Sequence, residues 1–128
     1  VDLFLVNEVE AMQLTGENNS ELMLDSMSKK YPNAEIVLTL GSSGSKYSGK
    51  GKVISQDIYK TKVADTTAAG DTFTGYFIAQ MMKGQGPEKA LDRSSMASSI
   101  SVSRKGASVS IPTMEEVMAR YTQIKQQI

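Results

Sequence analysis

The segment DTTAAGDTFTGYF, residues 65–77, carries the clearest indication of fold and chemistry in this chain of 128 residues. Three small residues, Ala68, Ala69 and Gly70, lead without interruption into apolar residues at helical spacing. Free N–H groups at such a helix start attract anions, and each interaction with a charge is worth about 0.3–1 kcal/mol. The pattern therefore predicts that these three residues can hold the negative charge that develops on a transferred phosphoryl group.

Asp71 lies on the same predicted turn, where a carboxylate would repel a phosphate unless it had a chemical role. A natural role is that of a general base, which contributes typically about 10²- to 10⁴-fold in rate. The alternative is that Asp71 only caps the helix, as aspartate often does. Helix physics alone does not decide between these two interpretations.

The flanking sequence predicts strands alternating with helices. Apolar runs indicate strands over 1–6 and 35–40, and the segments 8–14 and 20–31 have helical spacing. A hairpin is expected over 45–56 around Gly49 and Gly51. An alternating strand is expected at Ile58, Lys60, Lys62 and Ala64. Helices are expected after Gly70 and from Pro87. An irregular segment, 104–111, then leads to a last helix capped by Thr113.

This order predicts one α/β domain over residues 1–128, a doubly wound, mostly parallel sheet flanked by helices. In such sheets ligands bind at the loops that follow the strands. The length suits a single core. The sequence also lacks both the P-loop pattern GxxxxGK[ST] and the dinucleotide pattern GxGxxG.

Composition excludes several classes of site and partner. Lys plus Arg and Asp plus Glu number 14 each, and no basic run could follow a nucleic-acid backbone. The absence of Cys and His removes thiol nucleophiles, imidazole bases and the usual zinc ligands. No apolar run approaches the roughly 20 residues needed to cross a bilayer. We therefore expect a cytoplasmic protein with neither nucleic-acid nor membrane partners.

Four segments together resemble the ribokinase, or pfkB-type, family of sugar kinases. They are NEVEA at 7–11, TLGSSGSKY at 39–47, DTTAAGDTFTGYF at 65–77 and SVSRKGASVSIPT at 101–113, in the order in which the family has them. The resemblance implies a ribokinase-like α/β fold and an ATP-dependent carbohydrate kinase. It implies phosphoryl transfer to a hydroxymethyl group of a sugar, with ribose or a related pentose as first choice.

The resemblance also implies roles for the residues of these motifs. Asp71 would be the catalytic base, beside an anion hole formed by Ala68, Ala69 and Gly70, with Ala68 standing where the family usually has Gly. Asn7 would lie near the ATP phosphates. Glu10 would organise Mg²⁺ through water. Without the family, Glu8 and Glu10 are interpreted as a solvated helix face.

The other ATP-binding candidates lie in a strand-end loop and in a helix. Thr39, Gly41, Ser42 and Gly44 match the family's loop around the ATP phosphates and ribose, although the loop alone favours an ordinary Gly-Ser turn. Ser95 stands where ribokinases commonly place His or Asn near the adenine.

Many family members bind a monovalent cation, and K⁺ suits an oxygen cage of backbone carbonyls. The resemblance places its ligands at Asp65, Thr67, Val102, Lys105, Ala107 and Ser110. The alternative is a plain loop tied down by Asp65.

Family members run to about 300 residues in one domain. The resemblance therefore implies that this chain is the C-terminal portion, without the lid and most sugar-binding residues, and leaves open whether it is active alone. A truncated sheet predicts association, as a homodimer or with a partner that supplies strands. The alternatives are a non-catalytic nucleotide-binding module and a related kinase acting on fructose, a sugar acid or a nucleoside.

Overall fold

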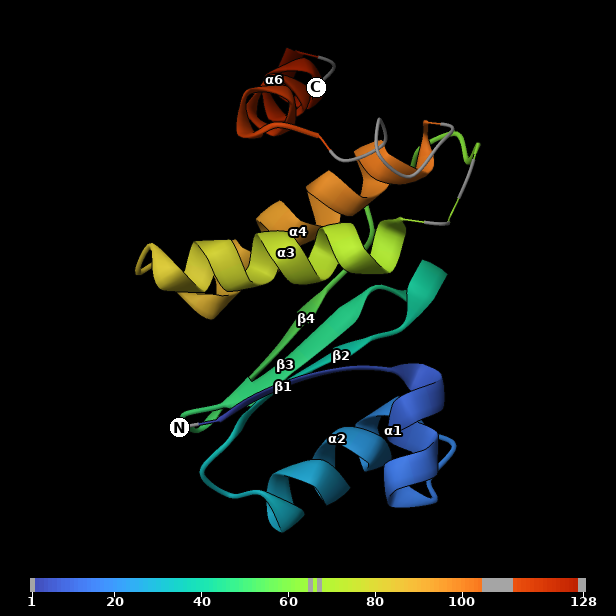
Figure 1. Ribbon diagram of the computed structural model, residues 1–128, viewed down its shortest axis with the longest axis vertical. Coiled ribbons are helices and arrows are strands. Elements are labelled where there is room, and N and C mark those ends of the chain that lie inside the picture. Colours follow the sequence, from blue (N-terminus) through green and yellow to red (C-terminus); the bar gives the residue numbers. More distant parts are fainter. Residues whose placement is uncertain (1, 65, 67, 105–111, 127–128) are drawn as a thin grey trace. The chain divides into compact units, whose positions relative to one another are not determined.

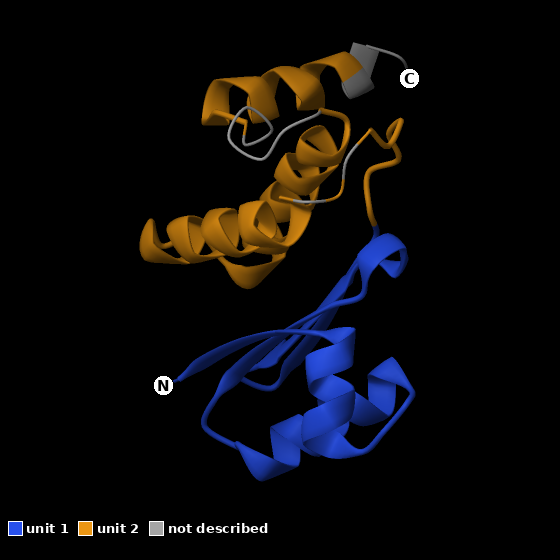
Figure 2. Ribbon diagram, turned by 45° about the vertical axis from the view of Figure 1, so that its right-hand side comes forward, with its two compact units in different colours: residues 1–57 blue, residues 58–128 orange. Residues whose placement is uncertain are grey.

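The computed structural model describes residues 2–64, 66, 68–104 and 112–126, and the side chains of all of these except 124–126. The chain divides into two compact units, residues 1–57 and 58–128 (Figure 2). Each unit contains a hydrophobic cluster of its own. The site candidates therefore fall into two groups, one in each unit.

The first unit is built on a four-stranded sheet in the order β1-β2-β3-β4 (Figure 1). The strands are β1 (Leu3–Asn7), β2 (Glu35–Thr39), β3 (Ser45–Gly49) and β4 (Lys52–Gln56). β1 and β2 are parallel, whereas β2 with β3 and β3 with β4 are antiparallel. The α/β class is confirmed, and in this chain the sheet is mixed, because the hairpin of β3 and β4 extends a single parallel pair.

Two helices of the first unit, α1 (Glu8–Thr15) and α2 (Ser20–Lys30), pack on the sheet. Local chemistry sets their ends: Gly16 ends α1 in the left-handed conformation, and the Asn19 side chain accepts hydrogen bonds from the N–H groups of Glu21 and Leu22 at the start of α2. The cluster beneath them joins helix and strand residues, namely Ala11, Met23, Leu24, Met27, Ile36, Leu38 and Leu40. Met23 and Met27 of α2 are thus part of the core.

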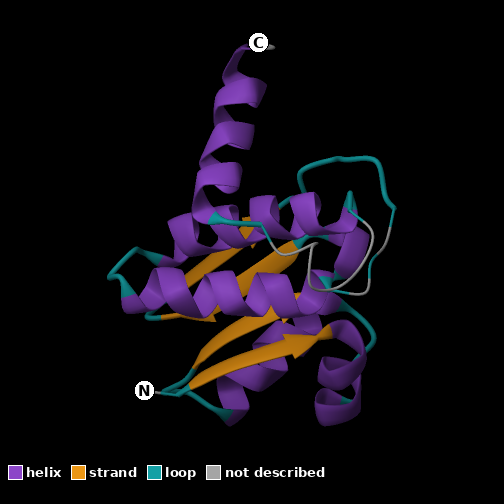
Figure 3. Cartoon of the chain, turned by 45° about the horizontal axis from the view of Figure 1, so that its top comes forward, coloured by secondary structure: helices purple, strands orange, loops and turns teal. Residues whose placement is uncertain are grey.

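The second unit contains three helices in its described part: α3 (Ala69–Met82), α4 (Pro87–Val102) and α6 (Met114–Gln126). α3 and α4 pack along each other (Figure 3). Buried side chains of α4 and α6, Met96, Ala97, Ile100 and Val117, form the cluster, against which Tyr59, Tyr76, Met114 and Tyr121 pack. None of the helices described is long and apolar enough to cross a membrane.

Residues 58–64 do not form the strand that their alternation predicts, since no strand of the described sheet pairs with them. Two contacts with α4 hold this segment instead. The Tyr59 hydroxyl donates a hydrogen bond to Asp92, and the Ala64 N–H donates to the Val102 carbonyl at 2.7 Å. The strand prediction was wrong: the segment has no partner strand among the described residues, and the residues in alternation, Ile58, Lys60, Lys62 and Ala64, are all exposed.

Candidate active site

The carboxyl ends of the two parallel strands lie side by side in the first unit. The register pairs Val6 with Leu38 and Asn7 with Thr39, the last residues of β1 and β2. The Thr39 Oγ1 also donates to the Val6 carbonyl at 3.4 Å. Because ligands of α/β sheets bind at the carboxyl ends of parallel strands, this edge is where a nucleotide is expected.

Asn7 and Glu10 form a reciprocal capping box at the start of α1. The Glu10 N–H donates to Asn7 Oδ1 at 2.8 Å, and the Asn7 N–H donates to Glu10 Oε1 at 2.9 Å. Both side chains are exposed, and the capping box does not use Glu10 Oε2. The Asn-x-x-Glu motif thus has a structural function that fixes an exposed carboxylate beside the strand ends.

The loop after β2 exposes its backbone at the same edge. Gly41 to Ser43 form one turn of 3₁₀ helix, all three exposed, and the Leu40 N–H donates to the Gly44 carbonyl at 2.8 Å. Gly44 has φ +93°, and a Cβ there would lie 2.2 Å from the Gln56 carbonyl oxygen. Only glycine fits this position, so the sequence of the loop is set by its close approach to β4.

In the second unit, Asp71 lies exposed in the first turn of α3. The N-cap residue is Ala68, which has no side-chain oxygen to offer, so Asp71 is not the cap that the alternative interpretation required. A Cβ placed on the neighbouring Gly70 would meet no atom of the described residues within 4 Å. The turn therefore combines an accessible carboxylate with an accessible stretch of backbone.

The backbone N–H groups of this turn are not all equally available. The Ala69 N–H already donates to the Thr66 carbonyl at 3.2 Å, and the Thr72 N–H donates to the Ala68 carbonyl at 2.9 Å. Ala68 is also buried, whereas Gly70 is exposed. Of the three residues predicted for the anion hole, Gly70 is the exposed one.

Serines of α4 hold the start of α3 in place, and sequence reasoning did not single them out for this role. Ser98 Oγ donates to the Ala69 carbonyl at 3.3 Å, and Thr72 Oγ1 donates to Ser101 Oγ at 3.4 Å. The signal available was the run of small residues along α4. Ser95, the candidate near the adenine, is 6% exposed on the same helix.

Of the residues predicted to bind a monovalent cation, Asp65, Thr67, Lys105, Ala107 and Ser110 lie outside the described residues. Val102 is the last residue of α4, and its carbonyl accepts the N–H of Ala64. A carbonyl oxygen has two lone pairs, so this hydrogen bond leaves one for a further partner. Among the described residues no group of three or more His, Cys, Asp and Glu side chains could hold a metal ion.

The structure thus brings together Asn7, Glu10, Thr39 and the loop 41–44 in one unit, and Ala68, Ala69, Gly70 and Asp71 in the other. The first group offers amide, hydroxyl and backbone groups with one carboxylate. The second offers a helix start with a carboxylate. Such groups suit the binding and transfer of a phosphoryl group.

Residues 1–114 match the family described as pfkB family carbohydrate kinase. The chain belongs to this family. A ribokinase of Staphylococcus aureus is 36% identical over 122 residues, and the match covers 91% of this chain and 40% of the relative. A 5-dehydro-2-deoxygluconokinase of Listeria innocua is 35% identical over 115 residues, covering 88% of this chain and 35% of the relative.

The fold of this pfkB-family member agrees with the fold of a relative whose structure has been solved. The structure of Arabidopsis thaliana ribokinase complexed with ribose and ATP superposes with a TM-score of 0.85 at 34% identity, covering 93% of this chain and 40% of that one. The ribokinase-like fold predicted from the motifs is therefore confirmed. The chain spans about 40% of the length of that structure and of the Staphylococcus relative.

Proposed function

We propose that this chain carries the ATP-binding and catalytic residues of a kinase that phosphorylates a hydroxymethyl group of a sugar, most simply ribose or a related pentose. The observation that carries the proposal is the first turn of α3, where Asp71 and Gly70 are both exposed and a Cβ on Gly70 would meet no described atom within 4 Å. Family membership and relatives named ribokinase support the same reaction.

In the proposed reaction Asp71 accepts the proton of the sugar hydroxyl as its oxygen forms a bond to the γ-phosphorus of ATP. The bond from that phosphorus to the bridging oxygen breaks, and ADP leaves with the electron pair. The helix start at Gly70 stabilises charge on the equatorial oxygens, with Ala68 and Ala69 shaping the turn. Phosphoryl transfer of this kind depends mainly on positioning and charge stabilisation, which are what a rigid helix start supplies.

The proposed nucleotide contacts lie at the edge formed by β1 and β2. Asn7 and Thr39 end adjacent strands, and Gly41, Ser42 and Gly44 expose or shape the backbone of the following loop. Ser95 is not part of this edge; on α4 of the second unit it stays a separate proposal, as a neighbour of the adenine. The contribution of this edge is binding and orientation of ATP.

The exposed carboxylate of Glu10 fits Mg²⁺, which usually keeps several waters and takes one or two carboxylates plus substrate phosphates. Mg²⁺ would neutralise the charge of the phosphates.

The Val102 carbonyl fits K⁺, for which carbonyl oxygens are suitable ligands. Asp65, Thr67, Lys105, Ala107 and Ser110 stay proposed ligands of that ion.

A second substrate class is favoured by one observation, the 35% identity to a relative named 5-dehydro-2-deoxygluconokinase. Assay of the full-length protein with Mg-ATP and a panel of ribose, other pentoses, fructose, a sugar acid and a nucleoside tests both proposals. We expect the highest kcat/KM with a pentose. ATP binding without phosphoryl transfer to any member of the panel would instead establish a non-catalytic nucleotide-binding module.

The edge of β1 supports the proposed association with further strands or with a second copy. Among the described strands β1 pairs only with β2, and Leu3 to Val6 are only partly buried. A free apolar edge strand favours pairing with another chain. Light scattering of the 128-residue chain should therefore give a mass above that of a monomer, and a monomer would contradict the proposal.

A further inference from the structure

Two neighbouring serines of α4 use their hydroxyl groups differently. Ser99 Oγ donates to a carbonyl of its own helix, that of Met96, at 2.7 Å. This is the usual behaviour of serine inside a helix, where the hydroxyl bonds to a carbonyl three or four positions back. Ser98 Oγ instead donates across to α3, to the Ala69 carbonyl at 3.3 Å. Ser98 therefore makes a contact between the two helices that a serine does not need for its own helix.

A second hydroxyl contact joins α3 and α4 one turn further on. Thr72 Oγ1 donates to Ser101 Oγ at 3.4 Å, and both side chains are buried. The two contacts are three positions apart on each helix, so they lie on one face of α3 and on one face of α4. Between them on α3 lie residues 70–71, the proposed phosphoryl-binding backbone and the proposed base.

The carbonyl that Ser98 contacts belongs to the same peptide unit as the Gly70 N–H. A peptide unit is planar and trans, so its carbonyl and its N–H point in opposite directions and turn together. Holding the Ala69 carbonyl therefore holds the direction of the Gly70 N–H, which lies in the first turn and has no acceptor within α3 itself. The hydrogen bond also polarises the peptide unit, which makes its N–H a stronger donor.

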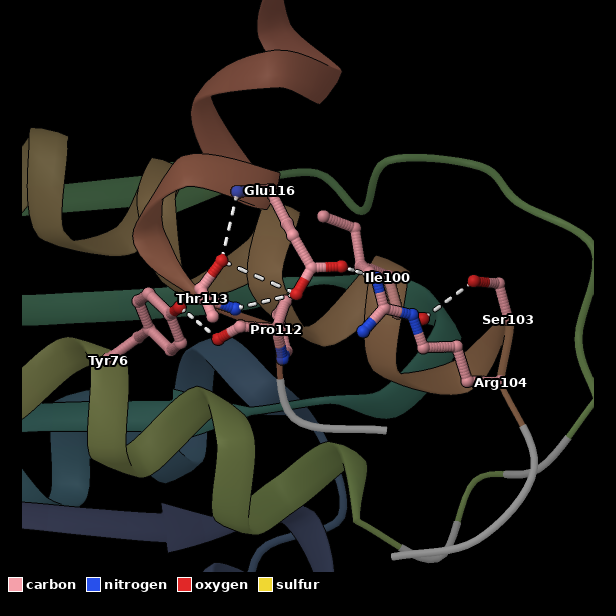
Figure 4. Close-up of polar contacts among 7 residues, drawn as sticks. All are labelled: Tyr76, Ile100, Ser103, Arg104, Pro112, Thr113 and Glu116. Carbon is pink, nitrogen blue, oxygen red and sulfur yellow. Dashed lines mark hydrogen bonds and ion pairs between the residues drawn. The ribbon is translucent and has the colours of Figure 1, made fainter. Parts of the chain in front are cut away.

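The end of α4 that carries Ser98 is itself held in place (Figure 4). The Ser103 hydroxyl donates to the Ile100 carbonyl at 2.6 Å at the last turn of the helix. Arg104, just beyond this turn, forms an ion pair with Glu116 at the start of α6. The hydroxyl of Ser98 is therefore offered to α3 from a restrained backbone rather than from a loose helix end.

We infer that Ser98 is a positioning residue for phosphoryl transfer, which sets the direction of the Gly70 N–H through the Ala69 carbonyl. The inference rests on the proposed function, in which the start of α3 stabilises charge on the transferred phosphoryl group. Ser98 acts through the peptide unit and not on the phosphoryl group itself. A donor that is already aimed when the charge develops needs no reorientation during the reaction, which is how such groups lower a barrier.

The length of the hydrogen bond limits the size of the effect. At 3.3 Å, the distance from Ser98 Oγ to the Ala69 oxygen exceeds the roughly 2.7–2.8 Å that is usual between two oxygens. Its loss should therefore cost less than the loss of a donor to the reacting oxygen itself, which is about 10²- to 10³-fold in kcat. We expect Ser98→Ala to lower kcat about five-fold. The KM for Mg-ATP should stay within about two-fold, because the contact matters for charge that develops only during transfer.

Three variants of the full-length protein separate positioning from packing. Ser98→Ala removes the hydroxyl that reaches α3. Ser99→Ala removes a hydroxyl that bonds within α4, at the adjacent position and with the same gain in helix propensity. Ser98→Thr keeps the hydroxyl and should retain kcat within about two-fold of wild type.

The measurements are kcat and the KM for Mg-ATP with the preferred sugar, the melting temperature, and the affinity for Mg-ADP with aluminium fluoride in the presence of that sugar. The fluoride complex imitates the phosphoryl group in transfer, so its affinity reports on the transition state. We expect Ser98→Ala to bind this complex about five-fold more weakly than Ser99→Ala does, while the two variants bind Mg-ADP alone equally and melt at the same temperature. A merely structural role would instead lower the melting temperature of Ser98→Ala and leave its affinity for the fluoride complex unchanged.

Equal kcat values, or equal affinities for the fluoride complex, in Ser98→Ala and Ser99→Ala would overturn the inference and leave the kinase proposal standing. The inference would also be overturned by a Ser98→Thr variant that melts like wild type but is as slow as Ser98→Ala. A wild type that transfers phosphate to no sugar of the panel would refute the proposed function, and the inference with it.

Discussion

Gly70→Ala separates a catalytic role of the α3 start from a structural one. Gly70 lies in the first turn of α3, and the added methyl group would meet no atom of the described chain within 4 Å. Alanine is favoured over glycine in a helix by roughly 0.5–1 kcal/mol. The protein should therefore become more stable, with a gain near the lower end of this range because the first turn is only partly helical.

The same methyl group projects into the space where the proposed phosphoryl group approaches the backbone. A displacement of about 1 Å in a reacting geometry can cost about 10²-fold in rate. We therefore expect kcat/KM to fall by about 10²-fold while the melting temperature rises by about 2 °C. A loss of activity together with a gain of stability cannot be explained by misfolding.

Gly75→Ala is the matched control, since Gly75 lies in the interior of the same helix and its added Cβ would also meet no described atom within 4 Å. This variant should be stabilised by about 1 kcal/mol and keep its activity. Thermal unfolding and steady-state kinetics of both variants decide the matter. If Gly70→Ala were as active as Gly75→Ala, the phosphoryl group would not approach Gly70 and the proposed anion site would be refuted.

Two further predictions concern the first unit and the second. Glu10→Gln keeps the hydrogen bond to the Asn7 N–H but should raise the Mg²⁺ concentration for half-maximal activity about 10-fold, the lower end of the range for loss of an outer-sphere partner. The control Glu8→Gln should leave this concentration unchanged. Equal Mg²⁺ requirements of the two variants would remove Glu10 from the magnesium site. Burial, with the hydrogen bond to Asp92, raises the pKa of Tyr59 from 10.0 to about 12. Because the pKa of Tyr59 is higher in the folded state than in the unfolded state, the neutral hydroxyl contributes to the free energy of unfolding below pH 10, and this contribution is lost as pH rises towards 12. Urea denaturation across that range should show a smaller loss for Tyr59→Phe than for wild type, and identical losses would contradict the assignment.

The helix boundaries could be predicted because local chemistry determines them. Asn19 caps α2, Pro87 begins α4 and the Thr113 hydroxyl caps α6, as expected from side chains that satisfy or lack N–H groups. The hairpin of β3 and β4 likewise follows from its turn, where Lys50 and Gly51 both have positive φ.

The contacts made between distant segments could not be predicted in the same way. Residues 58–64 alternate like a strand, yet Tyr59 is held by Asp92, which lies 33 positions further along the chain. Tertiary contacts of this kind override local patterns, because a strand also needs a neighbouring strand to accept its hydrogen bonds.

The candidate site was predicted in its parts, from motifs, rather than in its geometry. The cap at Thr113 was expected from its hydroxyl, whereas the reciprocal hydrogen bond from the Thr113 N–H to Glu116 and the ion pair of Glu116 with Arg104 were not. The motif containing Gly70 likewise does not reveal that the Ala69 N–H is already bonded to Thr66. The sequence shows which residue types are present, whereas only coordinates show which N–H groups already have hydrogen-bond partners.

The most direct test of the central claim is the turnover number of Asp71→Asn, which keeps the size of the side chain and removes the basic oxygen. Asp71 is exposed, so the variant should fold and bind Mg-ATP with near-normal affinity. We expect kcat for the sugar to fall by several decades, since a general base contributes about 10²- to 10⁴-fold. A variant that turned over at close to the wild-type rate would contradict the account, because Asp71 would then take no proton from the sugar.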